Sequence, residues 1–316
     1  MMEIFALKVP GPYTTVQDLG RFGYQQFGVP LTGALDSFAY RTANFLVGNS
    51  EGAAVLETTI LGPEMEILGE ADLAVTGADA PVTVNNVAVP GWSSFRVKAG
   101  DVVKIGPLRS GCRNYVAVTG GIDVPAVMGS RSCYVGAEIG GYKGRIQAKG
   151  DILSRGEGPL LRRSRSLPAE LIPVTPPEIL LRAVEGPQSD YFDRGLETFF
   201  ESEFSVSTHA NRMGYRLEGP PVVHKEGVAK SIISEPSLPG GVQITPDGQA
   251  IILLVEQTVG GYTKIATVIS SDISRVAQTK PGDLIRFENT SLEKAHIIYG
   301  ERQELLNKIR ERLEGI

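Results

Sequence analysis

The stretch Gln257–Lys264, QTVGGYTK, sets a glycine pair among polar side chains and runs directly into the segment Ile265–Ile269. β-Branched residues of the kind that fill this segment favour strands, and a glycine pair at a strand start is typical of a bulge or a barrel corner. A functional interpretation of the pair is also open, because glycine lets backbone N–H groups approach a ligand closely. The stretch therefore predicts a sheet and marks one candidate site.

Short strand patterns of the same kind recur along the chain. Turn signals separate them, for example Ala99–Asp101 and Pro281–Asp283. Further strands are expected at Ala71–Thr76, Val82–Val84, Phe95–Val97, Val102–Ile105, Tyr115–Val118, Glu178–Val184, Val222–Val223, Ile251–Val255 and Leu284–Phe287. Many short strands at regular spacing predict barrels or sandwiches.

Three segments carry helix signals. The first, Asp36–Gly48, begins with a capping aspartate and ends with a glycine stop. The second, Ser189–Phe199, begins with a capping serine, and Thr290–Glu293 is a capping-box pattern before a charged tail helix. One apolar stripe runs along that tail, formed by Leu305, Leu306, Ile309 and Leu313. The stripe either packs on the protein's own core or binds a partner.

The composition is that of an ordinary globular protein, with 42% apolar and 21% charged residues in a chain of 316. The 36 acidic and 31 basic side chains give a net charge of −5, which argues against nucleic-acid binding. The start lacks the features of a signal peptide, and the longest apolar run, Ala250–Val255, is too short to span a bilayer. We expect a cytoplasmic protein whose two cysteines, Cys112 and Cys133, are buried apolar side chains.

Several familiar catalytic motifs are absent from the sequence. It contains no phosphate-binding loop, no dinucleotide-binding glycine fingerprint, no nucleophile elbow and no Met-Lys-Met biotinylation signature. The three histidines, His209, His224 and His296, have no metal-ligand spacing. We expect neither a metal site nor a biotin attached to this chain.

A weak internal repeat suggests two related lobes. Gly140-Gly141-Tyr142 and Gly260-Gly261-Tyr262 are each followed by a Gly-Asp turn before a strand, at Gly150-Asp151 and Gly282-Asp283. Chance similarity is the alternative, because Gly-Asp is a common turn. The segment Ser154–Pro177, rich in Arg, Ser and Pro, is the predicted linker.

Dense clusters of glycine and polar residues cover much of the remaining chain. They lie at Thr15–Tyr24, Gly33–Asp36, Ala43–Asn49, Val118–Asp123, Gly129–Ser132, Arg212–Leu217 and Gln257–Lys264. Together they resemble the allophanate hydrolase subunit 2 and KipA family, which includes the C subunit of bacterial 5-oxoprolinase and the second half of the carboxyltransferase domain of urea carboxylase. The sequence departs from the family at Thr263, where proline is usual, and at Cys133, where threonine is usual.

The resemblance implies a mainly β fold. It consists of two cyclophilin-like β-barrel lobes with a few short helices and a C-terminal helix. The first lobe, with the N-terminal helix, is predicted at residues 1–160 and the second, with the C-terminal helix, at 175–316. An interwoven boundary is the alternative.

The resemblance also implies a subunit of an ATP-dependent 5-oxoprolinase, which opens 5-oxo-L-proline to L-glutamate and acts only with companion subunits. One companion would resemble the first half of the carboxyltransferase domain (KipI-like, or like the B subunit of 5-oxoprolinase), and a third subunit would be like the A subunit. ATP is the expected cofactor, bound in that complex. The alternatives are a carboxyltransferase-like subunit that acts on urea or a related amide, and a regulatory antagonist that binds a KipI-like kinase inhibitor.

A site for a lactam with a carboxylate needs cationic groups for the anion and amide groups for the lactam. We predict Arg212 and Lys264 as anion-binding groups; the alternatives are a salt bridge such as one to Glu218 for Arg212, and a solvated strand position for Lys264. The predicted catalytic residues are Arg212, Lys264, Gln243 and Tyr262. The predicted substrate-binding residues are Gln257, Thr258, Gly260, Gly261, Gln17, Arg21 and Asn44.

Structural interpretations compete for the polar residues of the N-terminal half. Asp18 and Arg21 pair with each other, tie down a turn, or lie at the interface with the companion. Asp36 is read first as a helix cap and second as catalytic. Asn44 contacts substrate or bonds nearby backbone, and Glu57 is either a buried, paired carboxylate or a site residue.

Overall fold

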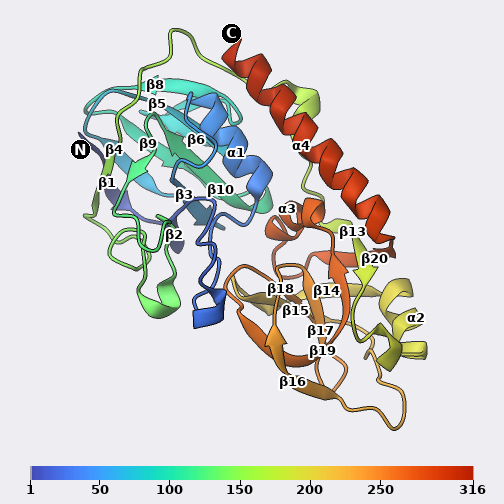
Figure 1. Ribbon diagram of the computed structural model, residues 1–316. Helices are drawn as coiled ribbons and strands as arrows, with labels where there is room; N and C mark the ends of the chain where they lie inside the picture. Colours follow the sequence, from blue (N-terminus) through green and yellow to red (C-terminus); the bar gives the residue numbers. More distant parts are fainter. Residues whose placement is uncertain (1, 316) are drawn as a thin grey trace. The chain divides into compact units, whose positions relative to one another are not determined.

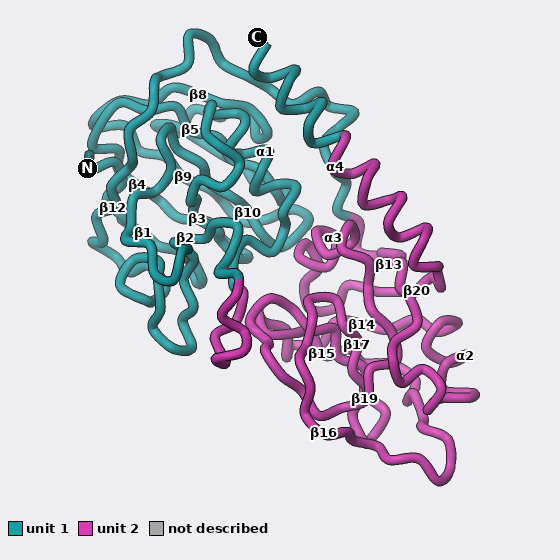
Figure 2. Tube along the Cα trace, in the orientation of Figure 1, with its two compact units in different colours: residues 1–22, 32–175, 305–316 teal, residues 23–31, 176–304 magenta. Residues whose placement is uncertain are grey.

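The computed structural model describes residues 2–315, and its chain divides into two compact units (Figures 1 and 2). Unit 1 comprises residues 1–22, 32–175 and 305–316, and unit 2 comprises residues 23–31 and 176–304. The units differ from the predicted lobes in two segments, because 23–31 belong to unit 2 and 305–316 belong to unit 1.

Unit 1 contains two antiparallel sheets. The five-stranded sheet has the order β2 (Tyr13–Gln17), β3 (Val55–Thr59), β10 (Ser110–Val118), β5 (Ala71–Asp79) and β8 (Ser94–Val97). The seven-stranded sheet has the order β11 (Ile122–Asp123), β12 (Ile152–Arg155), β1 (Met2–Val9), β4 (Glu64–Ile67), β9 (Val102–Ile105), β6 (Val82–Val84) and β7 (Val87–Val89). Alternation sets the buried face, since β4 buries Met65 and Ile67 in the core while Glu64 and Glu66 are partly exposed.

A second core lies on the other face of the five-stranded sheet. Tyr115 and Ala117 of β10 pack there with residues of helix α1 (Ser37–Leu46). The Asp36 carboxylate caps α1 by accepting from the Ala39 N–H at 3.0 Å, which confirms the predicted cap. Gly48 follows the helix with φ of 78°, a conformation that favours glycine.

The last turns of helix α4 (Leu292–Glu314) join this second core. Leu306, Ile309 and Leu313 are buried in it, and Leu305 packs at its edge. The prediction that the tail stripe packs on the protein's own core is therefore confirmed. In contrast, Leu292 and Tyr299 in the first half of α4 are about half exposed.

Unit 2 is a closed barrel. Its strands run in the order β13 (Glu178–Glu185), β20 (Leu284–Asn289), β14 (Glu203–Ala210), β15 (Gly214–Glu218), β18 (Ala250–Leu253), β17 (Gly241–Ile244) and β19 (Val259–Val268). The pairing of β13 with β19 closes this seven-stranded ring, and β16 (Ser231–Pro236) pairs with β19 as an additional edge strand. β13 and β20 are parallel, and the other neighbours are antiparallel. The mainly β fold class is thus confirmed.

Some local predictions were wrong. Ser189 starts a short 3-10 turn, η4 (Ser189–Tyr191), and the helix α2 (Arg194–Glu201) begins later. Val222–Val223 lies outside the strands, and helix α3 (Ile273–Ala277) was not predicted. The other short 3-10 turns are η1 (Gln25–Phe27), η2 (Val135–Ala137), η3 (Ala169–Leu171) and η5 (Ser270–Asp272).

The repeat and the linker also differ from expectation. Gly140-Gly141-Tyr142 lies in a turn of unit 1, whereas Gly260-Gly261-Tyr262 lies within strand β19, so the two copies have different structures. Most of the predicted linker Ser154–Pro177 is packed on unit 1. Arg165 Nη1 donates to the Phe45 carbonyl at 2.7 Å, and Leu167 is buried in the second core.

Candidate functional site

The predicted site residues fall in both units. Gln17, Arg21 and Asn44 belong to unit 1, and the other predicted residues belong to unit 2. Within unit 2, Gly260, Gly261, Tyr262 and Lys264 lie on strand β19, and Gln243 lies on its neighbour β17. Strand β19 carries the most distinctive chemistry of these elements.

Lys264 is a buried cation on strand β19. Its Nζ donates to Glu235 Oε2 at 3.1 Å and to the Pro236 carbonyl at 3.0 Å, both on β16. The lysine is 9% exposed, so it is not the solvated strand residue of the alternative interpretation. A buried ammonium needs a negative partner, and Glu235 supplies it.

Gln188 holds the same ion pair from a third element. Its Oε1 accepts from the Lys264 backbone N–H at 3.0 Å, and its Nε2 donates to Glu235 Oε1 at 3.4 Å. The accepting oxygen fixes the orientation of the amide, so that the NH₂ group faces the carboxylate. Neither Gln188 nor Glu235 was predicted from the sequence, because neither lies in a motif. The one signal near them is a neighbouring proline, Pro187 and Pro236 respectively, which restricts the backbone conformation.

Gln243 lies opposite Lys264 in the pairing of β17 with β19. The side chain is 3% exposed, and its Nε2 has no hydrogen-bond partner within residues 2–315. A Cβ added to Gly260 would lie 2.3 Å from this Nε2, so the glycine makes room for the amide. A buried donor without a partner is costly, which makes it a candidate contact for a ligand.

Arg212 lies in the turn between β14 and β15. Its Nε donates to Glu256 Oε1 at 2.6 Å, and its carbonyl accepts from the Glu256 N–H at 3.2 Å. The side chain is 3% exposed. The salt-bridge alternative therefore describes this arginine, but its partner is Glu256 and not Glu218.

The remaining predicted residues of unit 2 surround the glycine pair. Gln257 Nε2 donates to the carbonyl of Val259, two residues away, and the Thr258 carbonyl accepts from the Ser237 N–H at 2.9 Å. Tyr262 is exposed and opposite Ser231 of β16. Gly260 and Gly261 lie inside β19, paired with β16, and neither has a positive φ.

Thr263, the first family departure, has a clear contact. Its hydroxyl lies 2.7 Å from Nε2 of His224, and the imidazole packs against Phe192 with ring centroids 4.4 Å apart and the rings tilted by 38°. Burial lowers the pKa of His224 below its usual value, and the positive charge of Lys230 lowers this pKa further. Proline at position 263 could not make this hydrogen bond.

In unit 1, Asp18 and Arg21 tie down one loop. The Asp18 carboxylate accepts from the Ser130 and Ser132 hydroxyls and from the Arg131 N–H, at 2.5 to 2.7 Å. Arg21, fully buried, donates to the carbonyls of Val127 and Ser132 and to the Thr32 hydroxyl, at 2.9 to 3.1 Å. Burial lowers the pKa of the Arg21 guanidinium, an effect that the charge of Asp18 opposes.

Gln17 belongs to the same framework. Its Nε2 donates to the Cys133 carbonyl at 3.1 Å and to the Thr15 hydroxyl at 3.0 Å. Cys133 and Cys112 are both buried, which confirms the predicted burial. These contacts agree with the turn-holding interpretation of the cluster.

Asn44, Asp36 and Glu57 have structural contacts as well. Asn44 Nδ2 donates to the Ala53 carbonyl at 2.9 Å, in agreement with the alternative that Asn44 bonds to nearby backbone. The Tyr115 hydroxyl accepts from the Asp36 N–H at 2.8 Å and donates to Glu57 Oε2 at 2.9 Å. Burial raises the pKa of Tyr115 well above its usual value, with the charges of Glu57 and Asp36 adding to the effect, so the phenol stays protonated. Glu57 is thus a buried, paired carboxylate, with Arg113 Nε 3.7 Å away.

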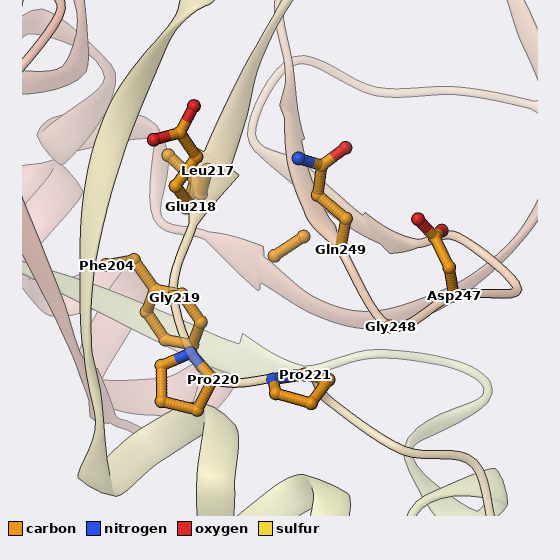
Figure 3. Close-up of a pocket in the computed structure, with 10 residues that line it drawn as sticks. Phe204, Leu217, Glu218, Gly219, Pro220, Pro221, Asp247, Gly248 and Gln249 are labelled. Atoms are coloured by element: carbon orange, nitrogen blue, oxygen red, sulfur yellow. The ribbon is translucent and has the colours of Figure 1, made fainter.

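A pocket of about 220 Å³ at the ends of β15 and β18 contains none of the predicted site residues (Figure 3). Its charged lining side chains are Glu218 and Asp247, and Figure 3 shows the Gln249 amide between them in this view. Arg216 Nη1 donates to Gln249 Oε1 at 2.8 Å. An acidic lining does not suit an anionic ligand, so this pocket is not assigned to the site.

Two kinds of feature are absent from residues 2–315. Across residues 2–315, no group of three or more His, Cys, Asp or Glu side chains is placed to hold a metal ion. Over the same residues, no helix is long and apolar enough to cross a membrane.

Comparison with known proteins defines the class. The family described as carboxyltransferase domain, subdomain A and B, matches residues 27–289. The chain is 38% identical to the C subunit of 5-oxoprolinase from Escherichia coli K12, over 96% of this chain and 97% of that protein. It is 33% identical to the corresponding 5-oxoprolinase C subunit of Haemophilus influenzae, over 94% of each.

Among solved structures, Kluyveromyces lactis urea amidolyase matches with a TM-score of 0.91 and 31% identity, covering 97% of this chain and 20% of that one. Sequence and fold thus both point to a carboxyltransferase-type β protein. The chain belongs to the carboxyltransferase domain family, subdomain A and B, which confirms the resemblance seen in its motifs.

Proposed function

We propose that the chain is the C subunit of a 5-oxoprolinase, a hydrolase that uses ATP to open 5-oxo-L-proline to L-glutamate. The observation that carries the proposal is the extent of the match. Almost the whole chain aligns with almost the whole of the Escherichia coli C subunit, whereas it corresponds to 20% of the urea amidolyase chain. On this proposal the chain is inactive alone and needs two companions, one like KipI or the B subunit and one like the A subunit.

The chemistry of strand β19 and its neighbours suits this substrate. 5-Oxo-L-proline carries a carboxylate and a lactam carbonyl. Lys264 offers an ammonium to the carboxylate, and Gln243 offers a buried N–H without a partner in the described chain to the carbonyl. Hydrolysis of the lactam develops negative charge on its oxygen, and a donor already fixed beside that oxygen stabilises the transition state.

The glycine pairs 120–121 and 260–261 do not fit a phosphate cradle. Gly260 and Gly261 lie inside a strand, without the alternating backbone turns that form an anion nest. In unit 1, the N–H groups of Gly120, Gly121 and Gly141 already bond to Asn49 Oδ1, the Val118 carbonyl and the Arg131 carbonyl. We therefore propose that the ATP is bound by one of the companions.

The test is ATP-dependent glutamate release from 5-oxo-L-proline, measured for the chain alone, the companions alone and the full assembly. We expect release from the full assembly only. Lys264→Met in an intact assembly should lower kcat/KM about a hundredfold. Lys225→Met is the matched control, because Lys225 forms an exposed pair with Asp193 in the same unit, and it should leave activity unchanged. An intact assembly that releases no glutamate would contradict the proposal.

A second candidate is carboxyl transfer to urea or a related amide. It is favoured by one observation, the TM-score of 0.91 against urea amidolyase. The test supplies a carboxylated biotin carrier and urea to the same assembly and measures loss of the carboxyl group from biotin. Transfer without glutamate release would replace the first proposal with this one.

A further inference from the structure

We infer that Lys264 and Gln188 form a carboxylate subsite, that the Glu235 carboxylate occupies it in this structure, and that the substrate carboxylate exchanges with Glu235. The inference deepens the proposed function and rests on it for the identity of the substrate. It makes Glu235 a specificity-determining residue, although no sequence motif marks it.

The arrangement around Glu235 is that of a bound carboxylate. Each oxygen has its own donor, with Lys264 Nζ 3.1 Å from Oε2 and Gln188 Nε2 3.4 Å from Oε1. Each donor has a second contact besides the Glu235 carboxylate. Nζ also bonds to the backbone carbonyl of the next residue, Pro236, and the Gln188 amide is fixed by the Lys264 backbone N–H. The donors therefore stay in place when the carboxylate leaves.

The two sides of the ion pair differ in burial. The Lys264 side chain is 11% exposed and the Glu235 side chain is 41% exposed. A lysine that is nearly buried needs an anion, whereas a half-exposed carboxylate returns to water at little cost. Glu235 also lies on the edge strand β16, whose register with β19 shifts between Ser231 and Glu235. A register shift of this kind redirects side chains at an edge.

A further donor lies beside this subsite. Gly260 is the cross-strand partner of Glu235, and the Gln243 Nε2 lies against Gly260. When the carboxylate of a ligand replaces that of Glu235, a second acceptor on the same ligand therefore lies near the buried Gln243 donor. The class of ligand is a small molecule that carries a carboxylate and a carbonyl a few atoms apart, as 5-oxo-L-proline does.

The test is calorimetric binding to the full chain and to its Glu235→Gln variant. The probes are 5-oxo-L-proline, acetate, and 2-pyrrolidone, which is the same lactam without the carboxylate. Glu235→Gln removes the charge that competes for Lys264 and keeps the shape of the side chain. Both carboxylate probes, 5-oxo-L-proline and acetate, should therefore bind about fivefold more tightly, which is the ratio expected for the loss of a partly exposed ion pair. The affinity for 2-pyrrolidone should not change.

Glu203→Gln is the matched control. Glu203 pairs with Arg286 on the same unit, with both side chains exposed, and its replacement should leave all three affinities unchanged. Glu235→Asp is the second variant, used where Glu235→Gln does not fold. Its shorter side chain cannot keep the contact with Nζ, so it should also tighten carboxylate binding.

The outcomes separate this inference from the proposed function. Tighter carboxylate binding by Glu235→Gln supports the subsite, even where the assembly releases no glutamate and the proposed substrate is wrong. Unchanged or weaker carboxylate binding in the folded Glu235→Gln variant overturns the subsite, even where glutamate is released. The absence of carboxylate binding in both wild type and variant overturns it as well.

Discussion

Replacing Gly260 with alanine tests whether the strand beside it holds the Gln243 amide in place. A Cβ at position 260 would lie 2.3 Å from Gln243 Nε2 and 3.1 Å from its carbonyl carbon. Ordinary contacts of a Cβ begin near 3.4 Å, so the amide has to move by about 1 Å. The glycine is thus required by its neighbour and not by its own backbone, because its φ is not positive.

The expected magnitudes follow from this displacement. Overpacking of a filled site costs about 1–3 kcal/mol, and alanine in a strand regains about 0.5–1 kcal/mol over glycine. The free energy of unfolding should therefore fall by up to about 2.5 kcal/mol. A positioning error of about 1 Å lowers kcat/KM about a hundredfold, so the loss of activity should exceed what the loss of stability explains.

The assay combines urea unfolding of the full chain with glutamate release by the assembly. The double variant Gly260→Ala with Gln243→Ala should regain the stability, because the short side chain vacates the space, but not the activity. Gly300→Ala, in helix α4 with nothing within 4 Å, is the control and should leave activity unchanged. Full activity of Gly260→Ala would refute the placement of Gln243 in the site, and a double variant as unstable as the single one would refute the steric argument.

Three other predictions concern the framework and its pH dependence. Tyr115→Phe removes one hydrogen bond to the buried Glu57 carboxylate and one from the Asp36 N–H. The free energy of unfolding, measured in urea, should therefore fall by about 2–4 kcal/mol, and a fall of less than about 1 kcal/mol would contradict this prediction. Asp18→Asn leaves donors of the loop at residues 130–132 without a charged acceptor, and limited proteolysis should then cut within that loop, while uncut protein would argue against its role. The pKa of His224 is lowered in the folded protein, so as the pH falls the unfolded chain binds the proton before the folded chain does. The contribution of neutral His224 to the free energy of unfolding is therefore complete above the usual histidine pKa of 6.5 and decreases below that value. His224→Gln should flatten this dependence in urea unfolding between about pH 5 and 7, and an unchanged slope would count against it.

Much of the local structure was predictable from short-range patterns. The Asp36 cap bonds to Ala39, three residues away, and the alternation of the predicted strand β9 (Val102–Ile105) lies within four residues. The family was also accessible from the sequence, because its glycine and polar clusters are specific in combination. The helix start after Ser189 was missed, since a serine before an apolar segment is compatible with a 3-10 turn as well as with a helix.

The partners of the site residues were decided by tertiary structure. Lys264 was predicted as a site residue from its sequence cluster, but its carboxylate partner Glu235 is 29 residues away and Gln188 is 76 residues away. Arg212 pairs with Glu256, 44 residues away, and not with Glu218 in its own strand hairpin. The sequence determines which charged side chains are present. Which of them form pairs is determined when the barrel closes, because strands that are distant in the chain become neighbours only in the sheet.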